Sequence, residues 1–286
     1  MESSPLFSAV APVRPAAAYV GGKRNLARRL VSLIETIPHR TYAEPFVGMG
    51  GVFLRRQQRP QAEVINDYSL DVATLYRVLQ RHYPLFRDFL RFQLTTRSEF
   101  ERLIKVDPST LTDLERSARF LYLQRTAFGG KVSGRNFGVS HHRSGQFDVT
   151  KLGPMLEDLH ERLGGVIVER LPFDAFIRRY DSTETLFYLD PPYWGCETDY
   201  GADLFSRDQF EVLASTLAGI QGQFILSLND RPEVRETFAA FNIEAVTTAY
   251  SVQGGGQAAA EVIMRNPHSA TNGRQASGHL SASVVK

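Results

Sequence analysis

The segment Asp190-Pro191-Pro192-Tyr193 combines a carboxylate, a stiff backbone and an aromatic ring directly after the apolar run 185–189. Two consecutive prolines remove two backbone donors and fix two φ angles, so the carbonyl groups of this turn are free to accept hydrogen bonds. The Asp190 carboxylate and the Pro191 carbonyl could together accept both hydrogens of an exocyclic amino group. A proline-stiffened turn in which Asp190 caps a backbone amide is the alternative interpretation.

Such a pair of acceptors suits chemistry on an amine that is attached to an aromatic ring. This kind of amine is a poor nucleophile, because its lone pair is delocalised into the ring. Two acceptors bound to its N–H groups favour a pyramidal nitrogen and return electron density for attack. Tyr193 would supply a face on which a base stacks after it has been flipped out of a duplex. The turn therefore predicts substitution at the exocyclic amine of a nucleobase.

A second segment, Glu44-Pro45-Phe46-Val47-Gly48-Met49-Gly50, has the composition of a ligand-binding turn that follows a strand. Its glycines would let a ligand approach the backbone, and an acidic residue about 20 positions further on, here Asp67, can bind ribose hydroxyls. Phe53 stands where the last glycine of a dinucleotide-binding turn would be. The segment therefore favours an adenosine-containing cofactor other than NAD.

The elements that must position these residues begin with a strand, turn and strand unit. Apolar residues at helical spacing predict a first helix over 26–37 and a later one with Val72, Leu75 and Leu79 on one face. Between them, two short apolar runs at 42–47 and 63–66 predict strands, and residues 52–54 are expected to open a helix after the glycine-rich turn. Residues 1–18 are expected to be disordered.

Five later apolar runs complete the predicted sheet. Three have the character of buried parallel strands, and the last two, with little between them, suggest an antiparallel hairpin at the edge. Ser206 and Gln209 predict a capping box ahead of another amphipathic helix. An α/β fold with about seven strands follows from the count. The runs are 166–171, 185–189, 224–228, 243–247 and 261–264.

The middle of the chain interrupts this pattern. Residues 81–164 are helical at both ends, with a capping box at Thr112 and Glu115, and contain the glycine-rich basic stretch 129–138. We expect an inserted, mainly helical domain here. It would separate a cofactor-binding part (19–80) from a catalytic part (165–266), and residues 267–286 would form a flexible tail.

Basic side chains gather in the insert. The whole chain has a formal net charge of +2, yet residues 76–164 hold 15 Lys or Arg against 10 Asp or Glu. Such a local excess suits a polyanion, although a solvated basic surface would have the same composition. Arg125, Lys131, Arg135 and Asn136 are the residues that we expect to contact it.

Composition excludes several protein classes. Hydrophobic residues make up 43% and charged residues 22%, which is typical of a globular protein and not of a disordered or fibrous one. No apolar run reaches the roughly 18 residues that a membrane span needs, and prolines interrupt any secretory signal near the N-terminus. Cys196 is the only cysteine, so a cytoplasmic setting is expected. The histidine spacing argues for no metal site.

Taken in order, the motifs resemble the Dam-like (D12 class) adenine-specific DNA methyltransferases, which transfer a methyl group from S-adenosylmethionine to the exocyclic amine of adenine. The resemblance covers residues 19–266 and places a recognition region between the cofactor motif and the catalytic one. It rests on Tyr19-Val20-Gly21-Gly22-Lys23, the segment 44–50, Ile65-Asn66-Asp67, Phe128-Gly129-Gly130-Lys131, Asn136-Phe137-Gly138 and Asp190-Pro191-Pro192-Tyr193.

The resemblance implies a Rossmann-like methyltransferase sheet, S-adenosylmethionine as cofactor and double-stranded DNA as partner. It implies a cytoplasmic enzyme of a bacterial or phage-infected cell; a monomer without metal is expected. The implied cofactor contacts are Tyr19, Lys23, Glu44, Phe46, Gly48, Asp67 and Asp190. The implied base-holding residues are Asp190, Pro191, Pro192 and Tyr193, and the implied DNA contacts are Arg125, Lys131, Arg135 and Asn136.

Two departures from the family bear on recognition. Where the family often has Lys-Trp ahead of Gly-Gly-Lys, this chain has Ala18-Tyr19, and Phe-Asn-Gly is replaced by Phe128-Gly129-Gly130. The target sequence is therefore not assumed to be that of the best-known members. Methylation of a cytosine amine or of an RNA adenine is the alternative activity. A DNA-binding module without catalysis would be expected to lack Asp190 or Tyr193, and both are present.

Overall fold

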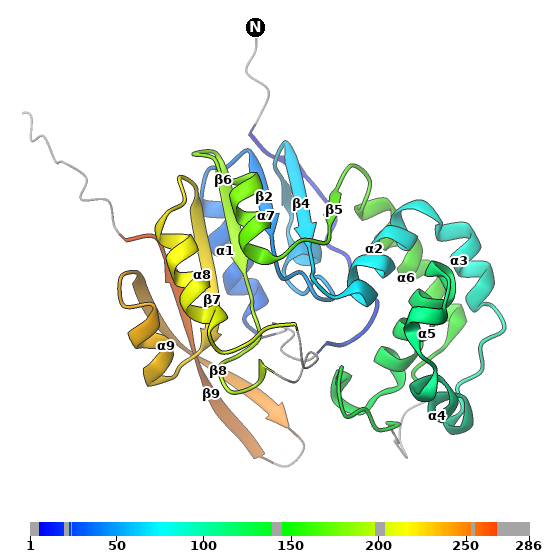
Figure 1. The fold of residues 1–286 in the computed structure, drawn as a ribbon. Coiled ribbons are helices and arrows are strands. Elements are labelled where there is room, and N and C mark those ends of the chain that lie inside the picture. Colours follow the sequence, from blue (N-terminus) through cyan, green and yellow to red (C-terminus); the bar gives the residue numbers. More distant parts are fainter. Residues whose placement is uncertain are drawn as a thin grey trace, which may run out of the picture.

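A computed structural model describes residues 6–19, 23, 25–138, 145–197, 204–252 and 255–267, with side chains outside 248–259. Within this part of the chain, the main feature is a seven-stranded sheet in the order β5-β4-β2-β6-β7-β9-β8 (Figure 1). The first five strands in this order are parallel, whereas β9 is antiparallel to both β7 and β8. The predicted α/β sheet with a late edge hairpin is confirmed. Strand bounds are Thr41–Glu44 (β2), Ala62–Asn66 (β4), Ile167–Glu169 (β5), Thr185–Leu189 (β6), Gln223–Asn229 (β7), Asn242–Val252 (β8) and Gly255–Arg265 (β9).

The order of strands contains a reversal at its centre. From β2 the chain moves outward through β4 to β5 and then returns to β6 on the other side of β2. Ligands of such sheets bind where the direction changes, outside the carboxyl ends of the strands. Glu44 is the last residue of β2, Asp67 follows β4, and Asp190 follows β6. The topology thus brings the two predicted motifs to one place.

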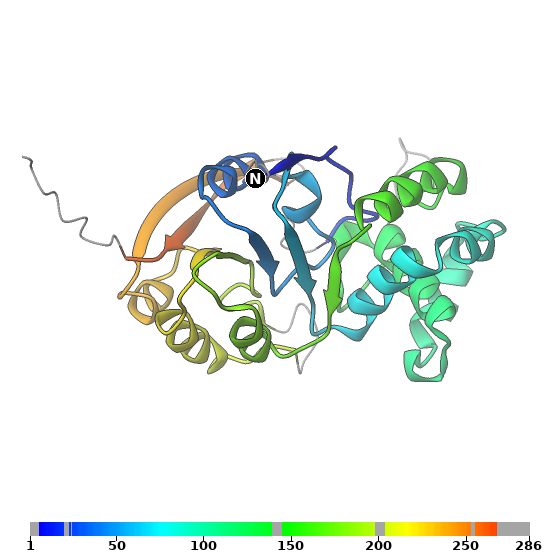
Figure 2. The same cartoon turned by 90° about the horizontal axis from the view of Figure 1, so that it is seen from above.

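Helices cover both faces of the sheet. The first, α1 (Ala27–Thr36), lies on one face, and α7 (Phe173–Tyr180), α8 (Gln209–Ala218) and α9 (Pro232–Thr237) lie on the other (Figures 1 and 2). The central strand β6 is buried on both sides, because Leu186 and Tyr188 join the core beneath α1 and Phe187 and Leu189 join the core beneath α7 and α8. An unbroken apolar sequence is what such a doubly covered parallel strand requires.

The remaining helices gather beyond the β5 edge of the sheet (Figure 2). Apolar side chains of α2, α3, α5 and α6 share one core cluster with those of α1. The predicted capping box is confirmed at the start of α5, where Thr112 and Glu115 each bond the other's backbone amide. The bounds are Leu70–Arg81 (α2), Tyr83–Leu90 (α3), Arg97–Lys105 (α4), Pro108–Thr110 (η2), Asp113–Thr126 (α5), Phe128–Gly130 (η3) and Val149–Arg162 (α6).

The expectation of disorder before residue 19 is wrong for residues 6–18. Ser8–Ala9 (β1) pairs with Gln58–Arg59 (β3), and the amide of Val13 donates to the carbonyl of Leu54 at 2.8 Å. Ala16 and Ala17 are buried. Backbone hydrogen bonds to distant residues hold this segment, and apolar periodicity cannot reveal such bonds. The predicted tail beyond Pro267 lies outside the described residues.

Two local predictions also differ from the structure. Residues 52–54 do not open a helix but lead into a single turn, η1 (Phe53–Arg55), after which Arg56 is extended. The guanidinium of Arg56 is buried in an ion pair with Glu63. The predicted capping box at Ser206 is also wrong, because Ser206 Oγ donates to Asp208 and α8 begins only at Gln209.

Candidate active site

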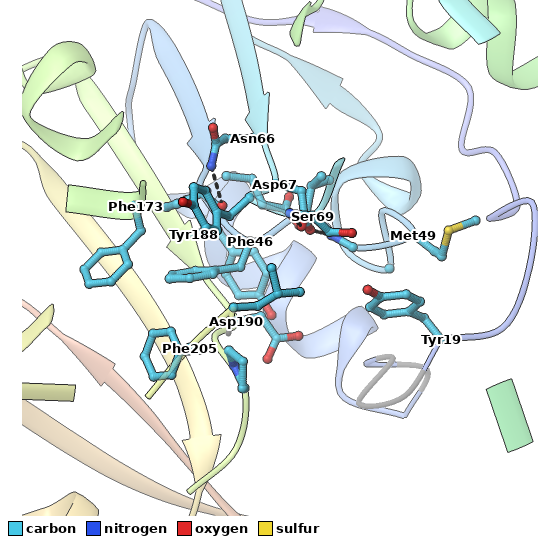
Figure 3. Close-up of a pocket in the computed structure, with 18 of the residues that line it drawn as sticks. Tyr19, Phe46, Met49, Asn66, Asp67, Ser69, Phe173, Tyr188, Asp190 and Phe205 are labelled. Atoms are coloured by element: carbon cyan, nitrogen blue, oxygen red, sulfur yellow. Dashed lines mark hydrogen bonds between the residues drawn. The ribbon is translucent and has the colours of Figure 1, made fainter. Parts of the chain in front are cut away.

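A cavity of about 680 Å³ lies at the carboxyl ends of β2, β4 and β6 (Figure 3). Seven residues predicted from sequence for the cofactor line this cavity, although the first and the last are 171 positions apart in the chain. Pro192 lines it as well. The seven are Tyr19, Lys23, Glu44, Phe46, Gly48, Asp67 and Asp190. Pro191 and Tyr193 lie directly beside it, in the same turn as Asp190.

The glycine-rich turn after β2 needs its glycines for conformation and for space. Gly48 has φ +49°, and a Cβ on it would lie 3.1 Å from the ring of Tyr19. Gly50 has φ +74°, and a Cβ there would lie 2.8 Å from the side chains of Leu54 and Tyr76. Side chains other than glycine adopt such positive φ values at a cost. Tyr19 therefore packs onto a backbone surface that only glycine can leave open.

Asp67 fixes this turn from the next strand. One carboxylate oxygen accepts a hydrogen bond from the Gly48 amide at 2.9 Å, and the other accepts from the Ser69 amide at 2.9 Å. Burial raises the pKa of Asp67 to about 6, although both amides act to lower it. Each oxygen keeps a lone pair, so Asp67 can still accept from a ligand hydroxyl in the cavity.

An aromatic group forms one wall of the cavity and was missed by the sequence analysis except for Phe46. The ring of Phe46 lies 5.5 Å from that of Phe173 and 6.0 Å from that of Phe205, centroid to centroid (Figure 3). Phe173 begins α7 and Phe205 precedes α8, and both are almost fully buried. This wall suits a planar apolar group such as a purine ring. No signal in the sequence separates these two phenylalanines from ordinary core residues.

The turn 190–193 follows β6 as predicted. Pro191 and Pro192 are buried, and the Asp190 carboxylate faces the cavity at 20% exposure (Figure 3). Burial raises the pKa of Asp190 to about 6; the Lys23 ammonium, 3.0 Å away, opposes this shift, and the Glu261 charge adds to it. The ionised form thus prevails at pH 7, and the carboxyl group becomes protonated as the pH falls through about 6.

Lys23 lies in a buried charge cluster with Asp190, Glu261 and Tyr193. Its Nζ is 3.1 Å from Glu261 Oε2 and also donates to the Tyr193 hydroxyl, which in turn donates to Glu261 at 2.7 Å. The Lys23 side chain is only 1% exposed. This lysine therefore binds the turn 190–193 directly, besides lining the cavity.

Glu44 differs from the other acids of the cavity. It is buried at the end of β2 and accepts a hydrogen bond from the Tyr42 hydroxyl at 2.6 Å. Burial raises its pKa to about 8, so the neutral acid prevails at pH 7. A neutral carboxyl group can donate one hydrogen bond and accept others, which widens the range of polar groups that it can hold.

The four residues predicted to contact DNA do not line the cavity. Lys131 and Asn136 are exposed, whereas Arg135 is half-buried and donates to the Lys131 carbonyl at 3.0 Å and to Gln124 at 3.2 Å. Arg125 donates to the carbonyls of Gln146 and Ala16, at 3.0 and 2.5 Å, and so has a structural role.

The glycine-rich stretch of the insert approaches the cavity through Gln124. The buried amide nitrogen of Gln124 donates to the carbonyl of Gly130 at 2.5 Å and to that of Ala18 at 2.8 Å. Ala18 lines the cavity next to Tyr19. Phe128, in the same stretch, is 62% exposed.

Two features are absent from the described residues. His, Cys, Asp and Glu side chains form no cluster of three that could hold a metal ion there, and His141 and His142 lie outside the described residues. No helix in the described part of the chain has the length and apolar character that a membrane span requires.

Comparisons with known proteins agree with this geometry. Two type II methyltransferases align over most of their own length. M.CviBI of Paramecium bursaria Chlorella virus NC1A is 21% identical over 80% of this chain and 88% of its own, and M1.LlaDCHI of Lactococcus lactis subsp. cremoris is 27% identical over 82% and 87%. The DNA N-6-adenine-methyltransferase of Escherichia phage P1 is 26% identical over 84% of this chain but only 34% of its own.

A solved structure titled as a putative RNA methyltransferase from Pyrococcus horikoshii aligns over 84% of this chain and 82% of that one, at 10% identity and a TM-score of 0.38, too low to support a conclusion about the site. The family model of the D12 class of N6 adenine-specific DNA methyltransferases, by contrast, matches residues 19–252, which include the glycine-rich turn, the insert and the catalytic turn. The chain belongs to this family of DNA methyltransferases.

Proposed function

We propose that this adenine-specific DNA methyltransferase takes its methyl group from S-adenosylmethionine and transfers it to the exocyclic amine of an adenine flipped out of double-stranded DNA at a specific site. The observation that carries the proposal is the position of Asp190 in the same cavity as Gly48 and Asp67. A base-holding turn and a nucleoside-binding turn that share one cavity allow two reacting groups to meet there.

The residues of the cavity fit S-adenosylmethionine. The glycine at 48 lets the ring of Tyr19 pack close to the backbone at the edge of the cavity, the Asp67 carboxylate has capacity for ribose hydroxyls, and Phe46 belongs to an aromatic wall that suits a purine. Lys23 binds Asp190 of the base-holding turn at 3.0 Å, and Glu44 lines the same cavity. When bound, S-adenosylmethionine supplies a methyl group that is susceptible to attack by a nucleophilic nitrogen.

The chain's own residues would prepare the amine for this attack. One Asp190 oxygen and the Pro191 carbonyl would each accept an N–H of the adenine amine, which localises its lone pair on nitrogen. The prolines fix the backbone so that the acceptors need no rearrangement. Lys23 and Glu261 both bind the hydroxyl of Tyr193. These bonds would hold the Tyr193 ring in place as a stacking surface for the base.

DNA recognition would fall to the insert. Lys131 and Asn136 are exposed, and the half-buried Arg135 is held against Gln124 in the same stretch. Exposed basic and amide side chains are the types that contact phosphates and base edges. We propose that this stretch enters a groove beside the flipped base. A cytoplasmic location is proposed because the substrate is DNA, and a monomeric state is proposed as the simplest arrangement.

The direct experiment is incubation with labelled S-adenosylmethionine and unmethylated genomic DNA, followed by base analysis and by mapping of the modified positions. Label in N6-methyladenine within one sequence context is the expected result. Label in cytosine, or label only when RNA replaces DNA, would show that the alternative substrate is correct. The mapped sequence then supplies the duplexes that the experiments below require.

Asp67→Ala should weaken S-adenosylmethionine binding by about 1 to 3 kcal/mol, the range for losing a charged hydrogen-bond partner. The substitution also frees the amides of Gly48 and Ser69, which Asp67 now binds. Calorimetry with the cofactor alone measures the effect. Asp67→Asn, which keeps an acceptor oxygen, should lose less. Wild-type affinity in both variants would show that a residue other than Asp67 contacts the ribose.

Alanine variants of the insert should separate phosphate contacts from base contacts. Loss of a phosphate contact lowers affinity on all sequences about equally and reduces the salt slope by roughly one unit. Loss of a base contact costs roughly 1 to 3 kcal/mol on the cognate site and little elsewhere. We expect Lys131→Ala to behave in the first way, and at least one of Arg135→Ala and Asn136→Ala in the second.

Binding to duplexes with single-base substitutions, at two salt concentrations, distinguishes the two classes. Lys105→Ala, on α4 of the insert and outside the glycine-rich stretch, is a matched control for the loss of one positive charge. If none of the three variants differs from this control, the glycine-rich stretch is a solvated surface and the recognition surface lies elsewhere, near Ala18 and Tyr19.

A further inference from the structure

Glu261 is a fully buried carboxylate whose role neither the motifs nor the proposed reaction explains. It lies on β9, where the residues that follow, Val262, Ile263 and Met264, are all apolar and fully buried. Its side chain is 1% exposed, and its Oε2 accepts from Lys23 at 3.1 Å and from Tyr193 at 2.7 Å. A buried charge costs free energy that an apolar side chain of similar size avoids. Packing alone therefore does not account for a glutamate here.

The strand register shows what Glu261 adds to the catalytic turn. Its partner across the β7–β9 pair is Asn229. Asn229 accepts from the Trp194 amide at 3.0 Å and donates to the Trp194 carbonyl at 3.0 Å, while Glu261 binds the side-chain hydroxyl of the preceding residue, Tyr193. Asn229 and Glu261, which face each other across β7 and β9, thus hold two successive residues of the loop. Asn229 binds the backbone of Trp194, and Glu261 binds the hydroxyl on the ring of Tyr193.

We propose that Glu261 is a positioning residue for methyl transfer: it fixes the ring of Tyr193 against the target base and shares the positive charge of Lys23 with Asp190. This inference rests on the proposed roles of Asp190 and Tyr193. Without Glu261, the ring would lose its anchor, and the ammonium of Lys23 would act on Asp190 alone. Asp190 would then be a weaker acceptor for the amine.

The electrostatic half of the proposal predicts a change in pH dependence. Asp190 must be ionised to accept an N–H, so kcat/KM should fall as the pH falls through about 6, the pKa of Asp190. The Glu261 charge raises this pKa and the Lys23 charge lowers it. Removal of the Glu261 charge should therefore move the fall of kcat/KM at acid pH, the acid limb of the pH profile, to lower pH by on the order of one unit.

Other titratable groups around Asp190 are not changed by this substitution. Lys23 faces Asp190 from the N-terminal segment, Glu44 from β2 and Tyr188 from β6, and Tyr193 follows it in the same turn. Each of these groups is present in both the wild type and Glu261→Gln, and any change in the effect of Lys23 on Asp190 is itself a result of the substitution at position 261. A shift of the limb in that variant is hence assigned to position 261.

Three substitutions separate the two parts of the proposal, the anchoring of the Tyr193 ring and the electrostatic effect on Asp190. Glu261→Gln keeps an oxygen that can accept from both Tyr193 and Lys23 but removes the charge. Tyr193→Phe removes the anchored hydroxyl but keeps the charge. Glu261→Ala removes both. Glu244→Gln, at an exposed glutamate of β8 that pairs with Arg29, is the matched control and should behave as the wild type.

The measurements are the pH profile of kcat/KM, single-turnover rates, and the fluorescence of a target duplex that carries 2-aminopurine in place of the adenine. Glu261→Gln should shift the acid limb and retain the wild-type fluorescence. Tyr193→Phe should retain the limb and change the fluorescence of the flipped base. Glu261→Ala should do both and lose roughly 10- to 100-fold in kcat, the equivalent of one charge-assisted hydrogen bond. Thermal unfolding and calorimetry with the cofactor verify that each variant is folded.

A wild-type pH profile in folded Glu261→Gln, together with wild-type fluorescence in folded Glu261→Ala, would overturn the proposal. Asp190→Ala, assayed in parallel, tells this failure from that of the proposed function. If Asp190→Ala is inactive while the Glu261 variants behave as the wild type, only the role of Glu261 is wrong. If Asp190→Ala is fully active, the proposed mechanism of the turn is wrong as well.

Discussion

Asp190→Ala is expected to lower kcat by roughly 10²- to 10³-fold or more, the range for removing one preorganised hydrogen-bonding group from a reaction centre. In the proposed reaction Asp190 would supply one of the two acceptors for the adenine amine, and its carboxylate faces the cavity that the glycine-rich turn also lines. The fold should survive, since Lys23 keeps Glu261 as a partner. Single-turnover kinetics on the mapped target duplex measure the effect free of product release.

Asp190→Asn is the conservative control for this experiment. It keeps the shape and one acceptor oxygen but loses the charge that Lys23 now faces. An activity between those of the wild type and Asp190→Ala is expected. A folded Asp190→Ala protein with full transfer activity would exclude the proposed amine-acceptor role, whatever the asparagine variant does.

The second large effect is expected on stability, at Glu63 of β4. This buried carboxylate accepts two hydrogen bonds from Arg162 of α6, at 2.7 and 2.8 Å, one from Arg59 at 2.7 Å and one from Arg56. Glu63→Gln would leave the guanidinium groups of Arg56 and Arg162, each 1% exposed, without a counter-charge. Breaking a buried pair in this way lowers the free energy of unfolding by about 3 to 5 kcal/mol.

Urea unfolding at neutral pH measures this loss. Glu184→Gln removes the same charge from an exposed pair with Arg40, and should change the free energy of unfolding by less than about 1 kcal/mol. Burial alone would raise the pKa of Glu63, but the three arginines outweigh it and lower the pKa. Its contribution to stability is thus present above the unfolded pKa and is lost as the pH falls through the folded one. A stability equal to that of Glu184→Gln would show that the arginines find other partners.

The parts of the site that could be predicted from sequence are those with a local chemical signature. Thr185–Leu189 is an unbroken apolar run and forms the strand predicted. Gly48 and Gly50 permit backbone conformations that other residues rarely adopt, whereas the two prolines after Asp190 restrict the backbone, and the place of both turns at strand ends then follows from the α/β pattern. Seven predicted residues meet in one cavity for this reason.

The parts that could not be predicted depend on partners far away in the chain. Glu261 is one acidic residue in an apolar strand, and its partners lie 238 and 68 positions before it. Phe205 resembles any core phenylalanine until α7 and β2 bring two other rings to it. The DNA contact predicted for Arg125 stays a prediction, but its hydrogen bonds to the carbonyls of Gln146 and Ala16 could not be predicted, because no pattern of side chains indicates a backbone acceptor.

The segment 6–18 carries a consequence for how the protein is cut or fused. The family match begins at residue 19, so a chain shortened to that boundary would retain every recognisable motif. It would also lose the carbonyls of Ala16 and Ala18, which bind Arg125 and Gln124 of the insert, and the strand pairing at Ser8–Ala9. This segment, which carries no motif, therefore connects helix α5 of the insert to the cavity residues around Tyr19, and a boundary drawn from similarity alone would remove it.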